Sequence, residues 1–115
     1  MTSTVDCIFC KIIAGDIPAT LVHQSERVIA FDDINPQAPT HVLIIPKTHV
    51  ENAADLAVVE PESLSELISV AKLIATERSL PGYRTVFNTG AAAGQSVFHA
   101  HLHLLGGRSL QWPPG

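Results

Sequence analysis

The stretch VFHAHLHLL, residues 97–105, alternates histidines with apolar residues and decides the fold expected around it. Successive side chains of a β-strand point to opposite faces, so His99, His101 and His103 are expected to share one face. The apolar residues between them would then face a core. Neutral imidazoles serve as nucleophiles, proton donors or metal ligands, whereas three of them contribute little to an ordinary surface strand. The pattern therefore predicts a reactive or metal-binding cluster, and a solvent-facing polar stripe is the alternative.

A loop of small residues leads into this strand. Thr89–Ser96 (TGAAAGQS) carries little side chain, so its backbone N–H groups can approach a phosphate closely, and Ser96 adds a hydroxyl donor. Small-residue loops are usually only turns, and it is the position of this loop, just before His101, that favours an anion site. Tyr83–Asn88 is predicted as the strand before the loop, and Val97–Leu105 as the strand after it.

One long amphipathic helix is expected between Pro61, which suits a first helical turn, and Pro81-Gly82, which ends the helix. Its apolar residues recur at steps of three and four: Leu64, Leu67, Ile68, Ala71 and Ile74. Cys7–Ala14 is predicted as a short helix. Leu21–Asp32 is predicted as two strands joined by a polar turn, and His41–Pro46 as a buried strand. Together these elements predict an α+β fold with an antiparallel sheet.

The chain of 115 residues is expected to form a single domain over residues 1–115. Its composition, 46% hydrophobic and 16% charged, is typical of an ordered globular protein. Seven Lys and Arg against eleven Asp and Glu give a formal net charge of −4, which argues against a nucleic-acid groove. No segment approaches the roughly 18 apolar residues of a membrane span, and residues 1–6 lack a signal-peptide core. We therefore expect a cytoplasmic protein that binds neither nucleic acid nor a membrane.

Residues 94–105 (GQSVFHAHLHLL) resemble the signature of the histidine triad (HIT) family, in which three histidines alternate with hydrophobic residues. Further stretches resemble that family in order along the chain: Cys7–Ile13, Ile17-Pro18, Phe31–Ile34, Pro36–His41 and Ile45–His49. The closing Trp112–Gly115 (WPPG) is similar more narrowly to the Hint branch, the purine nucleoside phosphoramidases. The resemblance implies a HIT-like antiparallel sheet of about five strands with one long and one short helix.

The resemblance also implies a hydrolase that cleaves a purine nucleoside phosphoramidate or an acyl-nucleotide. His101 would attack the α-phosphorus and form a nucleotidyl-histidine intermediate, which water then hydrolyses. His103 would hydrogen-bond a phosphate oxygen and stabilise the charge there, and Ser96 would help hold the phosphate or the leaving group. An attacking imidazole must be neutral at one nitrogen and oriented through the other, usually by a backbone carbonyl.

Five further residues match nucleotide contacts of the family. Asp33 and Ile34 match contacts to the ribose and the base, and Asn88 matches a contact to phosphate or ribose. Gly94 and Gln95 belong to the expected phosphate loop. From spacing alone, Asp33 could instead begin a loop and Asn88 could supply a turn. The expected ligand is a purine nucleotide such as an AMP derivative.

Cys7-x-x-Cys10 holds both cysteines of the chain. In a reducing compartment such a pair indicates a metal or redox site before it indicates a disulfide. Tetrahedral structural zinc needs four ligands, so two more must come from the histidines, and the resemblance implies His49 and His99. Zinc would then be structural, and catalysis would require no cofactor. Two free thiols without a metal are the alternative, and His23 and His41 receive no role.

Two other functions remain open from the sequence. One is dinucleoside polyphosphate hydrolysis, which the WPPG ending and the compact length disfavour. The other is a nucleotide-binding sensor or interaction protein whose hydrolysis is incidental. The resemblance further implies a homodimer with the long helix and the C-terminal tail near the partner subunit, although such a helix could equally cover its own sheet.

Overall fold

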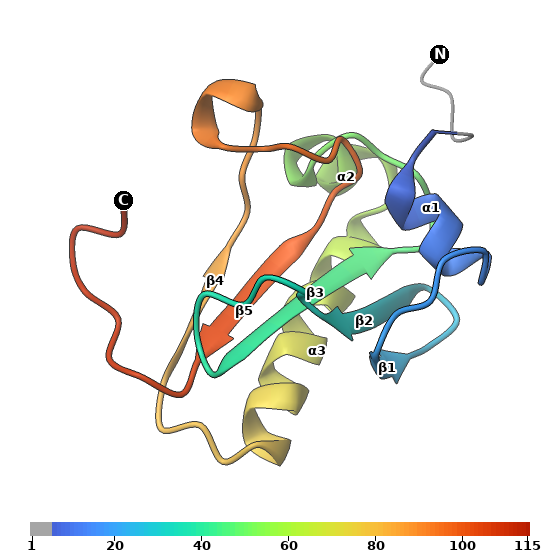
Figure 1. Cartoon of the computed structure of the whole chain (residues 1–115). Helices are drawn as coiled ribbons and strands as arrows, with labels where there is room; N and C mark the ends of the chain where they lie inside the picture. Colours follow the sequence, from blue (N-terminus) through green and yellow to red (C-terminus); the bar gives the residue numbers. More distant parts are fainter. Residues whose placement is uncertain (1–5) are drawn as a thin grey trace.

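The computed structural model describes residues 6–115, which contain one antiparallel sheet of five strands in the order β1-β2-β3-β5-β4 (Figure 1). The strands are β1 (Leu21–Gln24), β2 (Val28–Asp32), β3 (Thr40–Pro46), β4 (Tyr83–Val86) and β5 (Leu102–Gly106). Every neighbouring pair is antiparallel. The predicted α+β class with a five-stranded antiparallel sheet is confirmed.

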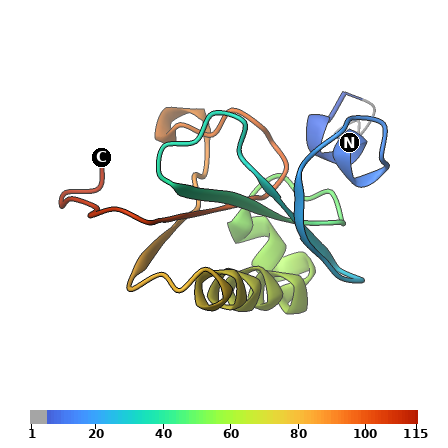
Figure 2. The same ribbon diagram turned by 60° about the horizontal axis from the view of Figure 1, so that its bottom comes forward.

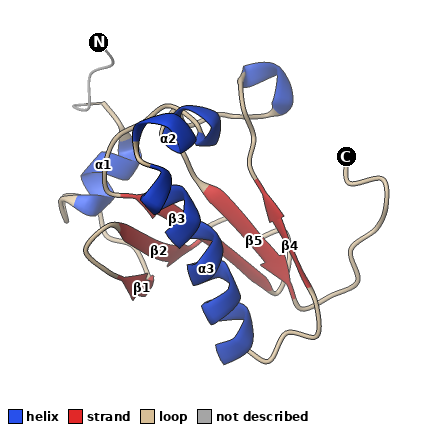
Figure 3. Ribbon diagram, turned by 180° about the vertical axis from the view of Figure 1, so that it is seen from behind, coloured by secondary structure: helices blue, strands red, loops and turns tan. Residues whose placement is uncertain are grey.

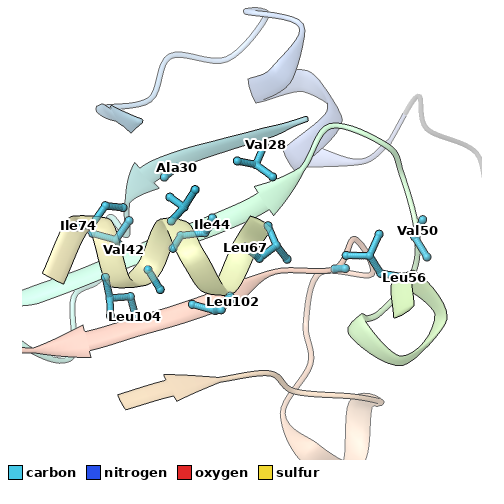
Figure 4. Packing of buried hydrophobic residues seen from close by; sticks show 13 residues of the cluster. Val28, Ala30, Val42, Ile44, Val50, Leu56, Leu67, Ile74, Leu102 and Leu104 are labelled. Atoms are coloured by element: carbon cyan, nitrogen blue, oxygen red, sulfur yellow. The ribbon is translucent and has the colours of Figure 1, made fainter. Parts of the chain in front are cut away.

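Helix α3 (Pro61–Glu77) covers one face of the sheet, as the views from below and from behind show (Figure 2, Figure 3). Side chains from this helix and from the central strands form the larger hydrophobic core (Figure 4). Its members are Val28, Ala30, Val42, Ile44, Val50, Leu56, Leu67, Val70, Ala71, Ile74, Ala100, Leu102 and Leu104. Burying one such large aliphatic side chain contributes about 1.5–3 kcal/mol, so this face makes the larger hydrophobic contribution to folding.

The predicted long helix is α3, which begins at Pro61 as expected and has Glu62 in its first turn, where a carboxylate favours the helix dipole. Its buried stripe is slightly rotated from the predicted one, because Val70 is buried whereas Ile68 is 52% exposed. Ile68 follows Leu67 by about 100° around the helix and so lies on the flank of the stripe. Within residues 6–115, no helix is long and apolar enough to cross a membrane.

Helix α2 (Ala53–Val59) is a short element that the sequence analysis did not predict. The side chain of Asn52 caps it by accepting a hydrogen bond from the backbone N–H of Asp55 at 2.8 Å. Its fully buried residue, Leu56, joins the core under α3. The structure therefore has two short helices beside the long one.

Helix α1 (Ile8–Ile13) is the predicted short helix, and it lies on the face of the sheet opposite α3 (Figure 2). Cys7 is its N-cap, and Gly15, with a φ of 82°, follows its end. A second and smaller core joins the helix to β2 and β3: Phe9, Ile29, Phe31, Leu43 and Ile45. This side of the sheet also carries the histidines.

The histidine-bearing strand β5 begins at Leu102, five residues later than the predicted start at Val97. The residues before Leu102 lie outside the strand. There, the backbone N–H of Ala100 donates a hydrogen bond to the carbonyl of Val50, in the segment after β3, at 2.7 Å. Alternation nevertheless holds, since Ala100, Leu102 and Leu104 all lie in the α3-side core. His101 consequently stands just before the strand, in irregular backbone.

Candidate functional site

His101 is 8% exposed and is oriented by the main chain of His99. Its Nδ1 lies 2.7 Å from the carbonyl oxygen of His99. A carbonyl only accepts, so Nδ1 carries the proton and Nε2 keeps its lone pair. Burial lowers the pKa of His101, which favours the neutral ring. The arrangement therefore leaves Nε2 as a neutral nucleophilic nitrogen.

A chain of hydrogen bonds fixes the opposite tautomer on His103. The backbone N–H of Gln37 donates to Nδ1 of His41 at 3.0 Å, so neutral His41 carries its proton on Nε2. That nitrogen lies 2.9 Å from Nδ1 of His103, which must accept. The proton of His103 is therefore on Nε2. Burial first, and then the neighbouring His101 and His41, lower the pKa of His103 to about 4.

Asp33 completes this chain from the loop after β2. Its Oδ2 lies 3.4 Å from Nε2 of His41, and its Oδ1 accepts from the backbone N–H of Asn35 at 2.8 Å. The ligand atoms of Asp33, His41 and His103 are close enough to hold a cation. The Gln37 N–H, however, occupies Nδ1 of His41 and keeps a proton on Nε2, so a hydrogen-bond chain that orients His103 fits this trio better than a metal.

His41 received no role in the sequence analysis, yet the structure brings it into contact with His103. Its position in β3, beside β5, brings it to His103 across a ring-to-ring distance of 5.2 Å. The signal that could have found it is its place in the family-like stretch Pro36–His41. The other unassigned histidine, His23, lies on β1 at the edge of the sheet.

An apolar cavity of about 470 Å³ lies between α1 and β2, a volume typical of small-molecule sites. Its lining residues are Ile8, Phe9, Ile12, Ile17, Pro18, Ala19, Thr20, Phe31, Asp32, Asp33, Ile34 and Leu43. Leu43 pairs with His103 in the sheet register, and the ring of Phe9 lies 5.1 Å from that of His101. The cavity therefore adjoins His101 and His103, and Asp33 and Ile34 lie in its wall. A larger open hollow of about 600 Å³ beside β4 has no histidine in its lining.

The small-residue loop forms one 3₁₀ turn, η1 (Ala91–Ala93), between two glycines with positive φ, Gly90 at 91° and Gly94 at 98°. Gln95, only 3% exposed, holds this loop in place. Its Oε1 accepts from the N–H of Gly90 at 2.8 Å, and its Nε2 donates to the carbonyls of Glu51 and Val97. The amide N–H groups of Gln95 are thus already used, and its side chain braces the loop.

The other three predicted residues of the loop region, Asn88, Gly94 and Ser96, precede or follow Gln95 along the chain. Asn88 follows β4 and is half-buried, and Gly94 is exposed. Ser96 is exposed and lines a separate cavity of about 280 Å³ with Cys7 and His49. The structure therefore brings Ser96 next to the cysteine cluster.

Cys7, Cys10, His49 and His99 form a second cluster, in which all four ligand atoms lie within 4.8 Å of one another. Nδ1 of His99 lies 3.4 Å from Sγ of Cys7 and 3.6 Å from Sγ of Cys10. Nδ1 of His49 lies 3.3 Å from Sγ of Cys10 and 3.2 Å from Nδ1 of His99. A tetrahedral zinc with ordinary bond lengths requires about 3.3 Å between two nitrogens and about 3.6 Å between nitrogen and sulfur. The cluster has the dimensions of a tetrahedral metal site.

The protonation pattern of the cluster also fits a cation. Nε2 of His99 lies 2.8 Å from the carbonyl of Pro46, so it holds the proton and Nδ1 presents a lone pair. Without a cation, burial and the neighbouring Cys7 raise the pKa of Cys10 to about 11, which keeps its thiol protonated. A bound cation would displace the thiol protons and be held by two thiolates and the Nδ1 lone pairs of the two histidines.

A family model describing the HIT domain matches residues 14–110. The chain belongs to the HIT family. The 14 kDa zinc-binding protein of Zea mays is 53% identical over 112 residues, which are 94% of this chain and 87% of the maize protein. The HIT family hydrolase of Legionella pneumophila has 50% identity and a TM-score of 0.90, covering 96% of this chain and 100% of that one.

A more distant HIT structure is that of a hypothetical histidine triad nucleotide-binding protein from Sulfolobus tokodaii. Its TM-score is 0.77 at 34% identity, and the match covers 87% of this chain and 68% of that one. This HIT chain therefore has the fold of HIT family hydrolases.

Proposed function

We propose that this HIT protein is a nucleotide hydrolase of the Hint branch that cleaves purine nucleoside phosphoramidates or acyl-nucleotides. The observation that carries the proposal is the pair of opposite tautomers, with a lone pair on Nε2 of His101 and a proton on Nε2 of His103. A nucleophile and a hydrogen-bond donor thereby stand side by side, with ring centroids 5.0 Å apart. Attack at phosphorus requires both.

In the first step, Nε2 of His101 attacks the α-phosphorus and a P–Nε2 bond forms. The bond from phosphorus to the leaving group breaks: a carboxylate departs from an acyl-nucleotide as the anion, and an amine takes up a proton from solvent, which regains one when water hydrolyses the intermediate. Nε2–H of His103 donates to a phosphate oxygen as charge gathers there. Water then attacks the nucleotidyl-histidine, which releases the nucleoside monophosphate and restores the neutral His101.

The cavity between α1 and β2 is the proposed nucleoside site. Its apolar lining, with Phe9 and Phe31 in edge-to-face contact at 5.6 Å, suits a purine ring. The carboxylate of Asp33 can accept from ribose hydroxyls, and Ile34, which is fully exposed, can cover the base. This supports AMP derivatives as ligands.

We assign the phosphate to the loop that precedes the histidines. Asn88 and Gly94 would supply polar groups around the phosphate, and Ser96 would serve the leaving group from the separate cavity that it lines with Cys7 and His49. Gln95 belongs to this site as a brace, because its carboxamide fixes both ends of the loop. Backbone N–H groups in a loop held by two positive-φ glycines can approach an anion without steric hindrance.

We propose structural zinc for the cluster of Cys7, Cys10, His49 and His99. The distances within the cluster support that metal, as does the similarity to the zinc-binding protein of maize. Zinc would supply a cross-link between α1, the segment after β3 and the segment before β5. Catalysis uses neither thiol, so the reaction needs no metal as a reagent.

A homodimer is the proposed assembly. β4 is an edge strand with one free side, and the hollow of about 600 Å³ with Tyr83 and Arg84 lies beside it. Unpaired strand edges are normally covered in soluble proteins. Sedimentation at micromolar concentration should give twice the mass of the chain, and a monomer would contradict this assembly.

The test compares substrates and traps the intermediate. An adenosine phosphoramidate should be hydrolysed to AMP faster than a dinucleoside tetraphosphate, and acid-free quenching with mass spectrometry should find AMP on His101. Faster cleavage of the dinucleoside tetraphosphate would favour polyphosphate hydrolysis instead. AMP binding with no turnover of either compound would favour a nucleotide sensor.

A further inference from the structure

His99 takes part in both clusters through different atoms. Its ring nitrogen Nδ1 belongs to the cluster with Cys7, Cys10 and His49. Its main-chain carbonyl accepts the hydrogen bond from Nδ1 of His101. One residue thus connects the metal ligands to the proposed nucleophile with no intervening side chain.

The position of that carbonyl depends on how the His99 ring is held. The ring is fully buried, and its Nε2 donates to the carbonyl of Pro46. On the other side of the ring, Nδ1 faces Nδ1 of His49 at 3.2 Å. Because Nδ1 of His99 holds a lone pair, this short separation needs either a proton on Nδ1 of His49 or a cation bound by both nitrogens. A bound cation would hold both rings and both cysteines at one point, whereas a single shared proton would hold only the two rings.

Phe9 provides a second physical connection between the clusters. It lies in α1 between the two cysteines, and its ring meets those of His99 at 5.9 Å and His101 at 5.1 Å, both edge-on. Helix α1 has only six residues, too few to be stable alone, so the cysteines would anchor it through the metal. A shift of α1 would remove one wall of the His101 pocket.

We propose that His99 is a positioning residue whose hold on His101 requires an occupied metal cluster, so that metal loading regulates the reactivity of the nucleophile. With the cluster filled, the His99 carbonyl keeps the His101 proton on Nδ1 and the lone pair on Nε2. With the cluster empty, His101 also samples the tautomer protonated on Nε2, which cannot attack phosphorus. The metal does not touch the substrate. This inference rests on the proposed function.

The test combines metal content, tautomer and kinetics on the full chain. Chelated wild type and Cys10→Ser should both lose bound Zn²⁺, measured by elemental mass spectrometry. The ¹⁵N chemical shifts of His101 should move from one fixed tautomer to a mixture. kcat should fall roughly 3- to 10-fold, as expected for loss of one orienting hydrogen bond, with KM little changed. Added Zn²⁺ should restore the chelated wild type and leave Cys10→Ser unrestored.

Val70→Ala controls for general destabilisation, because Val70 is buried on the α3 side of the sheet. It should lower the melting temperature while retaining Zn²⁺, the His101 tautomer and kcat. Unchanged ¹⁵N shifts in the metal-free chain would overturn the inference, whatever happens to kcat. If the Zn²⁺-loaded wild type turns over no nucleotide, the proposed function is wrong. The ¹⁵N chemical shifts still test whether the metal cluster controls the His101 tautomer.

Discussion

The two faces of the sheet differ in what they bury, although the same strands build both. On β5, Leu102 and Leu104 point into the core under α3, whereas His103 between them points to the other side. On β3, Val42 belongs to the α3 face and the neighbouring His41 to the histidine face. Because a strand alternates sides at every residue, one segment can carry folding stability and chemistry at once. Substitutions on the two faces should therefore have separable effects.

The largest effect is expected for His101→Ala. Loss of the nucleophile should lower kcat by roughly 10⁴- to 10⁶-fold, in the range measured when catalytic nucleophiles of other enzymes are removed. Because the ring is buried against Phe9, the melting temperature should also fall, so kcat is measured per folded molecule. His23→Ala on the edge strand β1 is the matched control and should retain full activity. Unchanged hydrolysis in His101→Ala would refute the nucleophile assignment.

Substitutions on the α3 face should lower the stability of the fold and leave the turnover of the folded protein unchanged. Leu67→Ala removes a fully buried side chain and should cost about 2–5 kcal/mol of unfolding free energy. Turnover per folded molecule should stay close to that of wild type. Ile68→Ala, one residue along and 52% exposed, should change stability by less than about 0.5 kcal/mol. Denaturant titration measures the unfolding free energy of both variants. Equal losses would show that the buried face of α3 has been assigned to the wrong residues.

His41→Phe tests the hydrogen-bond chain on the histidine face. It removes the donor to Nδ1 of His103 and frees that ring to take either tautomer. We expect kcat to fall about 10- to 100-fold, less than when a catalytic donor itself is deleted. AMP affinity should change far less. A loss confined to KM would indicate that His41 serves binding instead of orienting His103.

The smallest effect concerns pH. Burial lowers the pKa of His101 below its ordinary value, and burial together with the neighbouring His101 and His41 lowers that of His103 to about 4, so His103 stays neutral well into the acid range. The unfolded chain binds protons near pH 6.5 whereas folded His103 does not, so stability should fall as pH drops from about 6.5 toward 4. kcat/KM should stay level near neutrality and decline only on the acid side. A decline centred at or above 6.5 would contradict the role of burial.

The sequence predicted what depends on local periodicity. The alternation in residues 97–105 was enough to place Leu102 and Leu104 in a core, and the steps of three and four were enough for α3. The four residues of the cysteine cluster came from the family resemblance, and the structure brings their ligand atoms together.

The sequence did not predict what depends on contacts between distant segments. The role of His41 follows from the β3–β5 register, which no local pattern contains. The late start of β5 follows from the bond between Ala100 and Val50, and the brace role of Gln95 from its bond to Glu51. Helix α2 is only seven residues long, too short for a helical period to stand out.

The separation of 62 residues between His41 and His103 has a consequence for folding kinetics. Their contact forms only when β3 pairs with β5, and closing so long a segment is slower than forming the β1–β2 hairpin or α3. The hydrogen bond between His41 and His103 is thus among the last features to appear as the chain folds. In refolding experiments, recovery of hydrolysis should follow the helical signal with a delay, which makes enzymatic activity a reporter of the completed topology.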